Sequence, residues 1–261
     1  MTRSQPWEEL RALAVSMAAA AGQLALDQRS SALSQVDTKS SATDIVTAAD
    51  KAAEGLITDQ LAISRPDDGI VGEEGADAEG TTGLTWYLDP IDGTTNFFYG
   101  VPGWVVSIAV GDAAGIGAAA VFDPVANEMY SAHRGGGATC NDQPLAVRTA
   151  TPNLGQALVA TGFSYDADRR RSQAELLVEL LPQVRDIRRL GAAAKDLCLL
   201  ARGAYDAYYE LGLNSWDLAA GWLIAAEAGA RVEFLTPEGV DPPLLLGSAP
   251  ALFDELAQII T

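Results

Sequence analysis

Two carboxylates held three positions apart are the residues of this 261-residue chain that point most directly to chemistry. Asp89 and Asp92 stand in the run D-P-I-D-G-T, directly after the apolar segment 84–88. That segment predicts a buried strand that stops at Asp89, because Pro90 lacks a backbone donor and Gly93 permits a tight turn. Acids beside an apolar strand are costly unless a cation or a donor meets them. The pair therefore predicts a divalent-metal site at the carboxyl end of a strand, where open α/β sheets place ligands.

The residues after this turn have the chemistry of a phosphate site. Gly93 to Asn96 would present backbone N–H groups at the start of a short helix, where anions bind. The alternative for Thr94 is an ordinary helix cap, which is the commoner role for such a residue. A metal-binding pair directly before this segment favours phosphoryl chemistry.

Two further acids stand at the ends of apolar segments. Glu73 follows the strand-like segment 70–72, and Asp217 follows Trp216 at the start of an Ala-rich helix. Taken alone, Glu73 reads as a loop acid and Asp217 as a helix cap worth about 0.5–1 kcal/mol. Beside the acidic turn, they complete an oxygen-rich set of the kind that Mg²⁺ prefers.

Composition limits the classes of partner. Seventeen basic and 35 acidic residues give a formal net charge of −18, which argues against nucleic acid or an anionic membrane. Cys140 and Cys198 are too few for a disulfide scaffold and lack zinc spacing. No apolar run reaches the length of a membrane span, and the Ala-rich stretch near the beginning has the spacing of an amphipathic helix. We therefore expect a cytoplasmic protein with a small substrate.

Helical and strand-like segments follow one another along the whole chain. We expect a first helix over 6–27, a polar loop over 30–43, a helix beginning at Thr47 or Asp50, and a strand over 184–190. A meander of short strands occupies the middle. This order predicts an α+β fold with mixed sheets, and no linker divides residues 1–261 into separate domains.

Two groups of arginines have plain interpretations. Arg169 to Arg171 read as the solvated start of a helix. Arg185, Arg188 and Arg189 lie on a strand that approaches Gly191, so one of them could face a substrate cleft, but a surface ion pair is the plainer role.

Three blocks of the sequence resemble the signature blocks of the inositol monophosphatase family of metal-dependent phosphatases. They are G-E-E at 72–74, D-P-I-D-G-T-T-N-F at 89–97 and W-D-L-A-A-G at 216–221, in family order. The resemblance covers nearly the whole chain, and the long middle block is its most specific part. It implies one domain folded as a layered αβαβα sandwich with mixed and antiparallel sheets, usually a homodimer in the family.

The resemblance also implies roles for the matching residues. The implied metal ligands are Glu73, Asp89, the Ile91 carbonyl, Asp92 and Asp217, which would hold two Mg²⁺ ions with Asp89 shared between them. The implied catalytic residues are Thr94, Asp50 and Glu73, the first two helping to activate the attacking water. The implied substrate contacts are Asp92, Gly93, Thr94, Gly191, Ala192, Ala193, Glu210 and Asp217. Lys39 lies in the matching mobile loop, which in the family can assist a third, weaker metal.

The implied activity is Mg²⁺-dependent hydrolysis of a phosphate monoester on a polyol, by a water that two metals activate. Inositol 1-phosphate, giving myo-inositol and phosphate, is the first choice. Relatives act on fructose 1,6-bisphosphate, histidinol phosphate or 3′-phosphoadenosine phosphates, and Li⁺ sensitivity is a further family expectation. Ala192 stands where many relatives carry a hydroxyl residue, and the position of Asn214 varies among them, so the substrate stays open. The alternative of another class is a non-catalytic regulatory protein, for which a damaged metal set would be the sign.

Overall fold

The computed structural model describes residues 7–32, 36–38, 45–151, 153–236 and 243–261. Within them the chain alternates helices and strands in an α+β arrangement. The helices are α1 (Trp7–Ala32), α2 (Ala48–Ser64), α3 (Thr94–Tyr99), α4 (Ala167–Leu180), α5 (Ala193–Ala201), α6 (Ser215–Glu227) and α7 (Pro250–Ile260). The strands are β1 (Val36–Thr38), β2 (Ile45–Thr47), β3 (Gly69–Gly72), β4 (Thr85–Asp92), β5 (Val105–Asp112), β6 (Gly115–Asp123), β7 (Glu128–His133), β8 (Ala138–Cys140), β9 (Gln143–Pro144), β10 (Leu158–Thr161), β11 (Asp186–Arg188), β12 (Ala207–Leu211), β13 (Arg231–Leu235) and β14 (Leu244–Ser248).

The larger sheet carries the acidic turn. Its seven strands lie in the order β3-β4-β5-β6-β7-β8-β9, with β3 and β4 parallel and the later neighbours antiparallel. The smaller sheet has the order β11-β10-β12-β14-β13. Strand β10 is parallel to both β11 and β12, so the carboxyl ends of these three strands meet at one edge.

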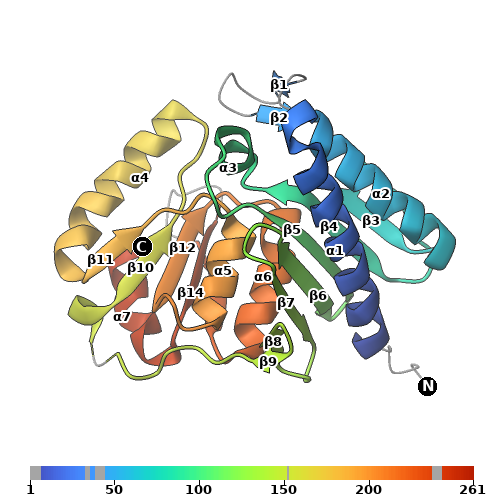
Figure 1. Ribbon diagram of the computed structural model, residues 1–261. Coiled ribbons are helices and arrows are strands. Elements are labelled where there is room, and N and C mark those ends of the chain that lie inside the picture. Colours follow the sequence, from blue (N-terminus) through green and yellow to red (C-terminus); the bar gives the residue numbers. More distant parts are fainter. Residues whose placement is uncertain (1–6, 33–35, 39–44, 152, 237–242) are drawn as a thin grey trace.

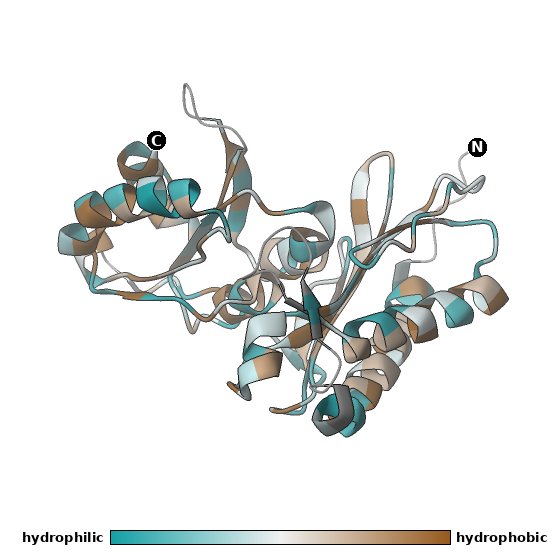
Figure 2. Ribbon diagram, turned by 90° about the horizontal axis from the view of Figure 1, so that it is seen from above, coloured by the Kyte–Doolittle hydropathy of each residue, from teal (hydrophilic) through white to brown (hydrophobic). Residues whose placement is uncertain are grey.

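The helices cover both sheets and separate them. Figures 1 and 2 show five layers: α4 and α7, the smaller sheet, α5 and α6, the larger sheet, then α1 and α2. Three clusters of buried apolar side chains fill the spaces between these layers. The alternation along β5 illustrates why, because Val106, Ile108 and Val110 face α1 and α2 while Val105 and Ala109 face α5 and α6. The predicted αβαβα sandwich is confirmed.

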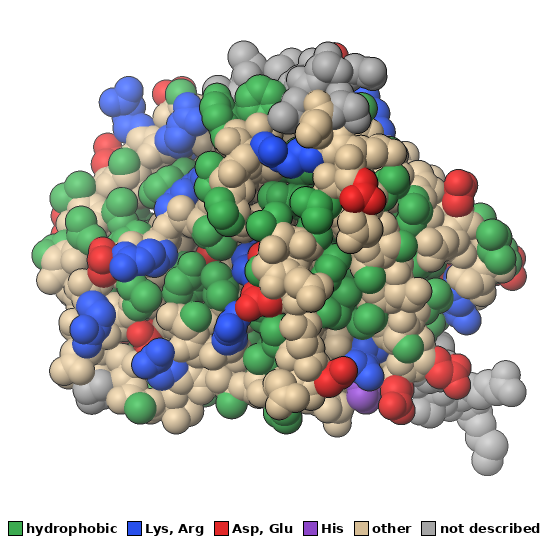
Figure 3. Space-filling view, viewed as in Figure 1, with side chains coloured by type: hydrophobic (Ala, Val, Ile, Leu, Met, Phe, Trp, Pro, Cys, Tyr) green, Lys and Arg blue, Asp and Glu red, His purple; other side chains and the backbone are tan. Residues whose placement is uncertain are grey.

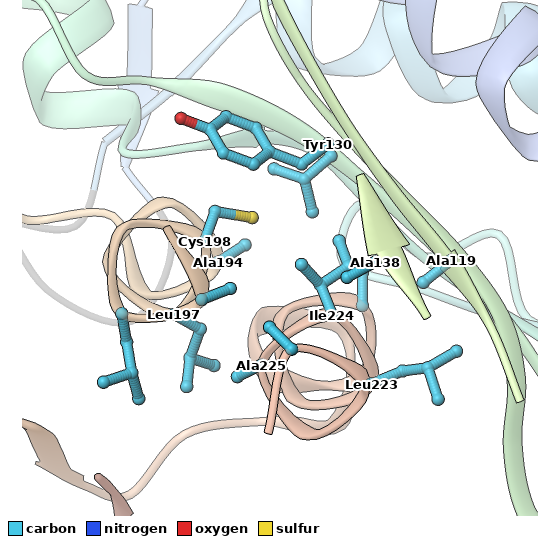
Figure 4. Close-up of a cluster of buried hydrophobic side chains, with 14 of the residues drawn as sticks. Ala119, Tyr130, Ala138, Ala194, Leu197, Cys198, Leu223, Ile224 and Ala225 are labelled. Atoms are coloured by element: carbon cyan, nitrogen blue, oxygen red, sulfur yellow. The ribbon is translucent and has the colours of Figure 1, made fainter. Parts of the chain in front are cut away.

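The central cluster fixes the position of α5 and α6 against the larger sheet. Ala194, Leu197 and Cys198 of α5 lie beside Ile224 of α6, with Tyr130 of the sheet above them (Figure 4). Small side chains allow the helices to approach closely: a Cβ added at Gly221 of α6 would lie 2.7 Å from the Leu197 Cβ. The first turns of both helices are thereby held rigidly at the edge where the acidic turn lies.

Several sequence-based boundaries need correction. The first helix runs to Ala32 instead of 27, and β1 lies inside the segment expected to be a loop. The strand expected over 184–190 is only β11, three residues long. Strand β4 does not stop at Asp89: it continues to Asp92, with an irregular register between Asp89 opposite Ser107 and Asp92 opposite Val105. Such an irregularity accommodates a proline, because the residue there need not donate to the ladder.

No helix in the described ranges is both long enough and apolar enough to cross a membrane.

Candidate active site

The acidic turn lies at the irregular end of β4 and leads directly into α3. Gly93 is the N-cap of α3, with a φ of 90° that favours glycine. A Cβ at this position would lie 3.1 Å from the Ala192 Cβ and 3.3 Å from two backbone carbonyl oxygens. The predicted short helix is confirmed, and glycine is needed at its start for both conformation and space.

Thr94 and Asp50 meet in the buried interior of the site. The Thr94 hydroxyl lies 3.3 Å from Asp50 Oδ1 and 3.0 Å from the Ile91 carbonyl oxygen. Asp50 Oδ2 accepts hydrogen bonds from the backbone N–H and the hydroxyl of Thr47, at 2.8 and 2.6 Å, so Asp50 is also the capping-box acid of α2. Thr94 is not the helix cap, since the N-cap of α3 is Gly93 and Thr94 is the first residue of the helix.

Asp92 and Asp217 are each held by the first turn of a central helix. Asp92 accepts from the N–H groups of Ala193 at 3.2 Å and Ala194 at 2.7 Å, at the start of α5. Asp217 accepts from the Asn214 N–H at 2.6 Å, in the capping box of α6. The predicted cap role of Asp217 is therefore correct, and it does not remove Asp217 from the site.

Gly93, Thr94, Asp92 and Asp217 line one cleft of about 450 Å³, whereas the predicted catalytic residue Asp50 is fully buried and is not part of the lining. Residues from the larger sheet form one wall and the loops after β10, β11 and β12 form the other. The predicted site residues that line it are Glu73, Asp89, Ile91, Asp92, Gly93, Thr94, Gly191, Ala193, Glu210 and Asp217. A site assembled from strand ends and helix starts of this kind is the usual location of ligands in layered α/β structures.

Burial and mutual repulsion make this cleft strongly unfavourable for bare carboxylates. Burial raises the pKa of Asp89 well above its usual range, and the charges of Glu73, Asp92 and Asp217 raise it further. Burial and the Asp217 charge likewise raise the pKa of Asp92. Burial raises the pKa of Asp217 to about 7, with contributions from Glu73 and Glu210. A cation bound among these acids would relieve both costs.

The donor set suits a hard divalent cation. Four carboxylates and the Ile91 carbonyl offer only oxygen, the ligand type of Mg²⁺, whereas softer metals favour nitrogen or sulfur. Among the described side chains, no three His, Cys, Asp or Glu groups converge tightly enough to form a ready-made metal cluster. The oxygen ligands of these residues are thus of the type that Mg²⁺ prefers. Several of the carboxylate oxygens accept hydrogen bonds from backbone N–H groups.

Other predicted residues lie differently. Ala192 is buried and does not line the cleft. Its side chain lies next to Gly93 instead. Lys39 lies outside the described residues. Arg189 lines the cleft, whereas Arg188 forms the expected surface ion pair, 2.6 Å from Asp186. Arg169 is exposed in the first turn of α4, as expected of a solvated helix start, and it also borders the cleft.

Sequence reasoning also missed Glu54 of α2. Its carboxylate is buried and accepts hydrogen bonds from the N–H groups of Glu74 at 2.9 Å and Ala76 at 3.0 Å. Glu54 thereby fixes the loop that carries Glu73. A buried glutamate in the middle of an amphipathic helix was the available signal, because an unpaired one would be costly.

The profile of the inositol monophosphatase family matches residues 6–260. Inositol-1-monophosphatase SuhB of Mycobacterium tuberculosis is 48% identical over 230 residues, which cover 85% of this chain and 79% of that protein.

Solved structures give the same relationship. The structure of Mycobacterium tuberculosis SuhB has a TM-score of 0.84 and 40% identity, covering 98% of this chain and 97% of that one. The structure of inositol monophosphate-bound SaIMPase-II has a TM-score of 0.79 and 27% identity, covering 96% and 92%.

Proposed function

The chain belongs to the inositol monophosphatase family and is a phosphatase of that family, and we propose that it hydrolyses inositol 1-phosphate to myo-inositol and phosphate with the help of Mg²⁺. The observation that carries this proposal is that Thr94, which contacts the buried Asp50, lines the same cleft as Glu73, Asp89, Asp92 and Asp217. The name of one relative and the ligand of one solved structure support the choice of substrate.

The metal ligands in this proposal are Glu73, Asp89, Asp92, Asp217 and the Ile91 carbonyl. Two divalent ions bound there would activate a water and stabilise charge on the transferred phosphoryl group and the leaving oxygen. The third, weaker ion expected from the family stays part of the proposal. Glu73 has a second role in it, as an acid that helps to orient the attacking water.

The chain supplies a path for the proton of the attacking water. The Thr94 hydroxyl has one proton and two nearby acceptors, Asp50 Oδ1 and the Ile91 oxygen. When that proton is directed to Asp50, the hydroxyl oxygen can accept a hydrogen bond from a water in the cleft. Asp50 is well suited to this task, because Thr47 holds its other oxygen in place.

The opposite wall would bind the substrate. Gly93 and Thr94 open the helix that would meet the phosphate, and Asp92 and Asp217 lie beside it. Glu210 is partly buried and lines the cleft, and its carboxylate accepts a hydrogen bond from the Tyr208 hydroxyl at 2.6 Å, which would fix its direction toward substrate hydroxyls. Gly191 and Ala193 complete this wall, and Ala192 would act through its contact with Gly93 and not by touching substrate.

Phosphate release from a panel of inositol, sugar and nucleotide phosphates, with and without Mg²⁺, tests the proposal. We expect Mg²⁺-dependent turnover with inositol 1-phosphate ranked first by kcat/KM. A different top substrate, such as histidinol phosphate or a 3′-phosphoadenosine phosphate, would refute the specificity and keep the chemistry. Complete absence of turnover would instead favour the regulatory alternative. Inhibition by Li⁺, a homodimer in solution and a cytoplasmic location belong to the same proposal, and inhibition curves, light scattering and fractionation test them.

A further inference from the structure

Glu210 of β12 and Gly162, the residue directly after β10, are neighbours on adjacent strands. Strands β10 and β12 are parallel, with Thr161 opposite Tyr209, so Gly162 comes next to Glu210 when this register continues. Side chains alternate along a strand, and Glu210 therefore lies on the same face of the smaller sheet as Tyr208, a member of the central cluster. At the point where this face reaches the cleft, the neighbour of Glu210 has no side chain.

The Glu210 carboxylate occupies the space that a side chain at position 162 would need. A Cβ added at Gly162 would lie 2.0 Å from Glu210 Oε2, 2.1 Å from Cδ and 2.2 Å from Oε1. Rotation about the last side-chain bond cannot remove this overlap, because Cδ lies on the axis of that rotation. The whole carboxylate would have to move by about 1 Å to reach even 3.0 Å, and the hydrogen bond from Tyr208, 2.6 Å long, would have to change with it.

The surroundings of Glu210 contain charges of both signs. Lys and Arg side chains gather mainly on the half of the molecule that carries α4, β10 and β11, on the face shown in Figure 3. Burial raises the pKa of Glu210, whereas the Tyr208 hydrogen bond and the charge of Arg189 lower it. Burial and the charge of Glu210 raise the pKa of Asp196, a buried acid of α5. The Glu210 carboxylate thus has attractive partners and a repelling neighbour, and a displacement of about 1 Å would disturb this balance.

The overlap at Gly162 differs from a clash between backbones. A Cβ at Gly80 would meet the backbone nitrogen of Gly69 at 2.1 Å, and that atom cannot retreat unless β3 moves. At Gly162 the three nearest atoms all belong to the far end of one flexible side chain. The fold can therefore accept a methyl group at position 162 by moving Glu210, so the cost falls on the cleft and not on the sheet.

We propose that Gly162 is a positioning residue through which the enzyme selects substrates by their hydroxyl groups. The inference rests on the proposed function, in which Glu210 contacts the hydroxyls of a polyol phosphate. Gly162 acts through Glu210, because the space that it leaves open is the space in which that carboxylate lies. A larger residue would displace the carboxylate, whereas Asp89 and Asp92 belong to the larger sheet and would stay in place. Phosphate hydrolysis would then continue without a preference for polyols.

The experiment compares inositol 1-phosphate with phenyl phosphate, a monoester whose alcohol part carries no hydroxyl group. The measured quantity is the ratio of kcat/KM for the first substrate to that for the second, with Mg²⁺ present. We expect Gly162→Ala to lower this ratio roughly 10- to 100-fold, because a hydrogen-bonding carboxylate is displaced by about 1 Å. Turnover of phenyl phosphate should stay at the wild-type level, which a general loss of structure would not allow.

A double-mutant cycle shows whether Gly162 acts through Glu210. Glu210→Ala should lower the same ratio, and adding Gly162→Ala to that variant should lower it no further. Gly55→Ala is the matched control, because a Cβ at this exposed position of α2 meets nothing within 4 Å, and it should keep the wild-type ratio. If Gly162→Ala alone fails to fold, folding of the double variant would support the overlap with Glu210, and its failure would refute it.

Three results would refute the proposal: an unchanged ratio in Gly162→Ala, an equal loss for both substrates, or an additional loss in the Glu210→Ala background. A crystal structure of Gly162→Ala gives a readout that needs no turnover, since the contact between the Tyr208 hydroxyl and Glu210 should be broken. An unchanged Glu210 would overturn the inference even in an active enzyme. A displaced Glu210 in a protein whose wild type shows no preference for inositol 1-phosphate would support the positioning role while refuting the proposed substrate.

Discussion

Replacing Asp92 with asparagine separates a catalytic acid from a structural one. Asp92 is buried and accepts hydrogen bonds from Ala193 and Ala194 at the start of α5. Asparagine has the same shape and keeps one acceptor oxygen, so about 1.5–3 kcal/mol is lost with the second, charge-assisted bond. Burial of the charge and repulsion from Asp217 both raise the Asp92 pKa, and asparagine carries no charge. Removing these two costs stabilises the folded protein and partly offsets the lost hydrogen bond.

We therefore expect the free energy of unfolding of Asp92→Asn to stay within about 2 kcal/mol of the wild type. Phosphatase activity should fall at least about 1000-fold, equivalent to roughly 4 kcal/mol of transition-state stabilisation, because a proposed metal ligand is lost. Urea unfolding and Mg²⁺-dependent phosphate release measure the two quantities. Asp59→Asn, an exposed acid on α2, is the control and should change neither. Wild-type turnover in Asp92→Asn would refute the catalytic role, and gross unfolding would indicate a structural metal module.

Three further predictions concern the residues that support the site. Lys195→Met should lower the free energy of unfolding by about 3–5 kcal/mol, because buried Asp123, 3.0 Å from the Lys195 ammonium, would lose its cation and Glu128 would keep only Arg202; a loss below about 1 kcal/mol in urea unfolding would contradict this. Burial raises the pKa of Glu128, but hydrogen bonds from Lys195 and two other donors lower it to about 2. Its stabilisation is thus present above the ordinary value of 4.5 and is lost as the pH falls toward 2, so a pH series should show the wild type losing up to about 3 kcal/mol that Glu128→Gln does not lose. If the free energies of unfolding of the wild type and Glu128→Gln changed in parallel with pH, the stabilising role of the Glu128 carboxylate would be excluded. Glu54→Gln should raise the Mg²⁺ concentration needed for half-maximal activity, because the loop carrying Glu73 loses an anionic acceptor; an unchanged Mg²⁺ titration would show that this loop needs no such support.

The order of helices and strands could be predicted from the sequence because burial follows residue periodicity. Buried side chains of β5 alternate between two core clusters because the strand is covered on both faces. Buried side chains of α1 recur at helical spacing because only one face of that helix packs against the sheet. The continuation of β4 through Pro90 could not be predicted, since it depends on β5 pairing on both sides of an irregular register. Local proline chemistry stops an isolated strand but is overridden where a neighbouring strand re-forms the ladder.

The site was predictable where its chemistry is concentrated in one short run. Asp89, Asp92 and Thr94 lie within six residues, and a stiff turn limits where they can point. The contributions of Arg169 and Glu54 were not predictable, because their roles depend on which loop or helix start lies opposite them. An arginine at a helix start is usually solvated, and Arg169, although exposed, also borders the cleft because α4 begins shortly after β10 ends.

Helix capping and site chemistry are not competing roles in this fold. Asp50 and Asp217 are both the third helical residue, the last position of a capping box, in α2 and α6. In each box the N-cap N–H donates a hydrogen bond to one oxygen of the aspartate carboxylate, which fixes the side-chain rotamer. The other carboxylate oxygen takes no part in this capping hydrogen bond. For Asp50 that second oxygen is the one that faces Thr94. The cap therefore supplies the orientation that a site needs, and an acid at this position of a helix facing a cleft is a stronger candidate for chemistry because it is capped.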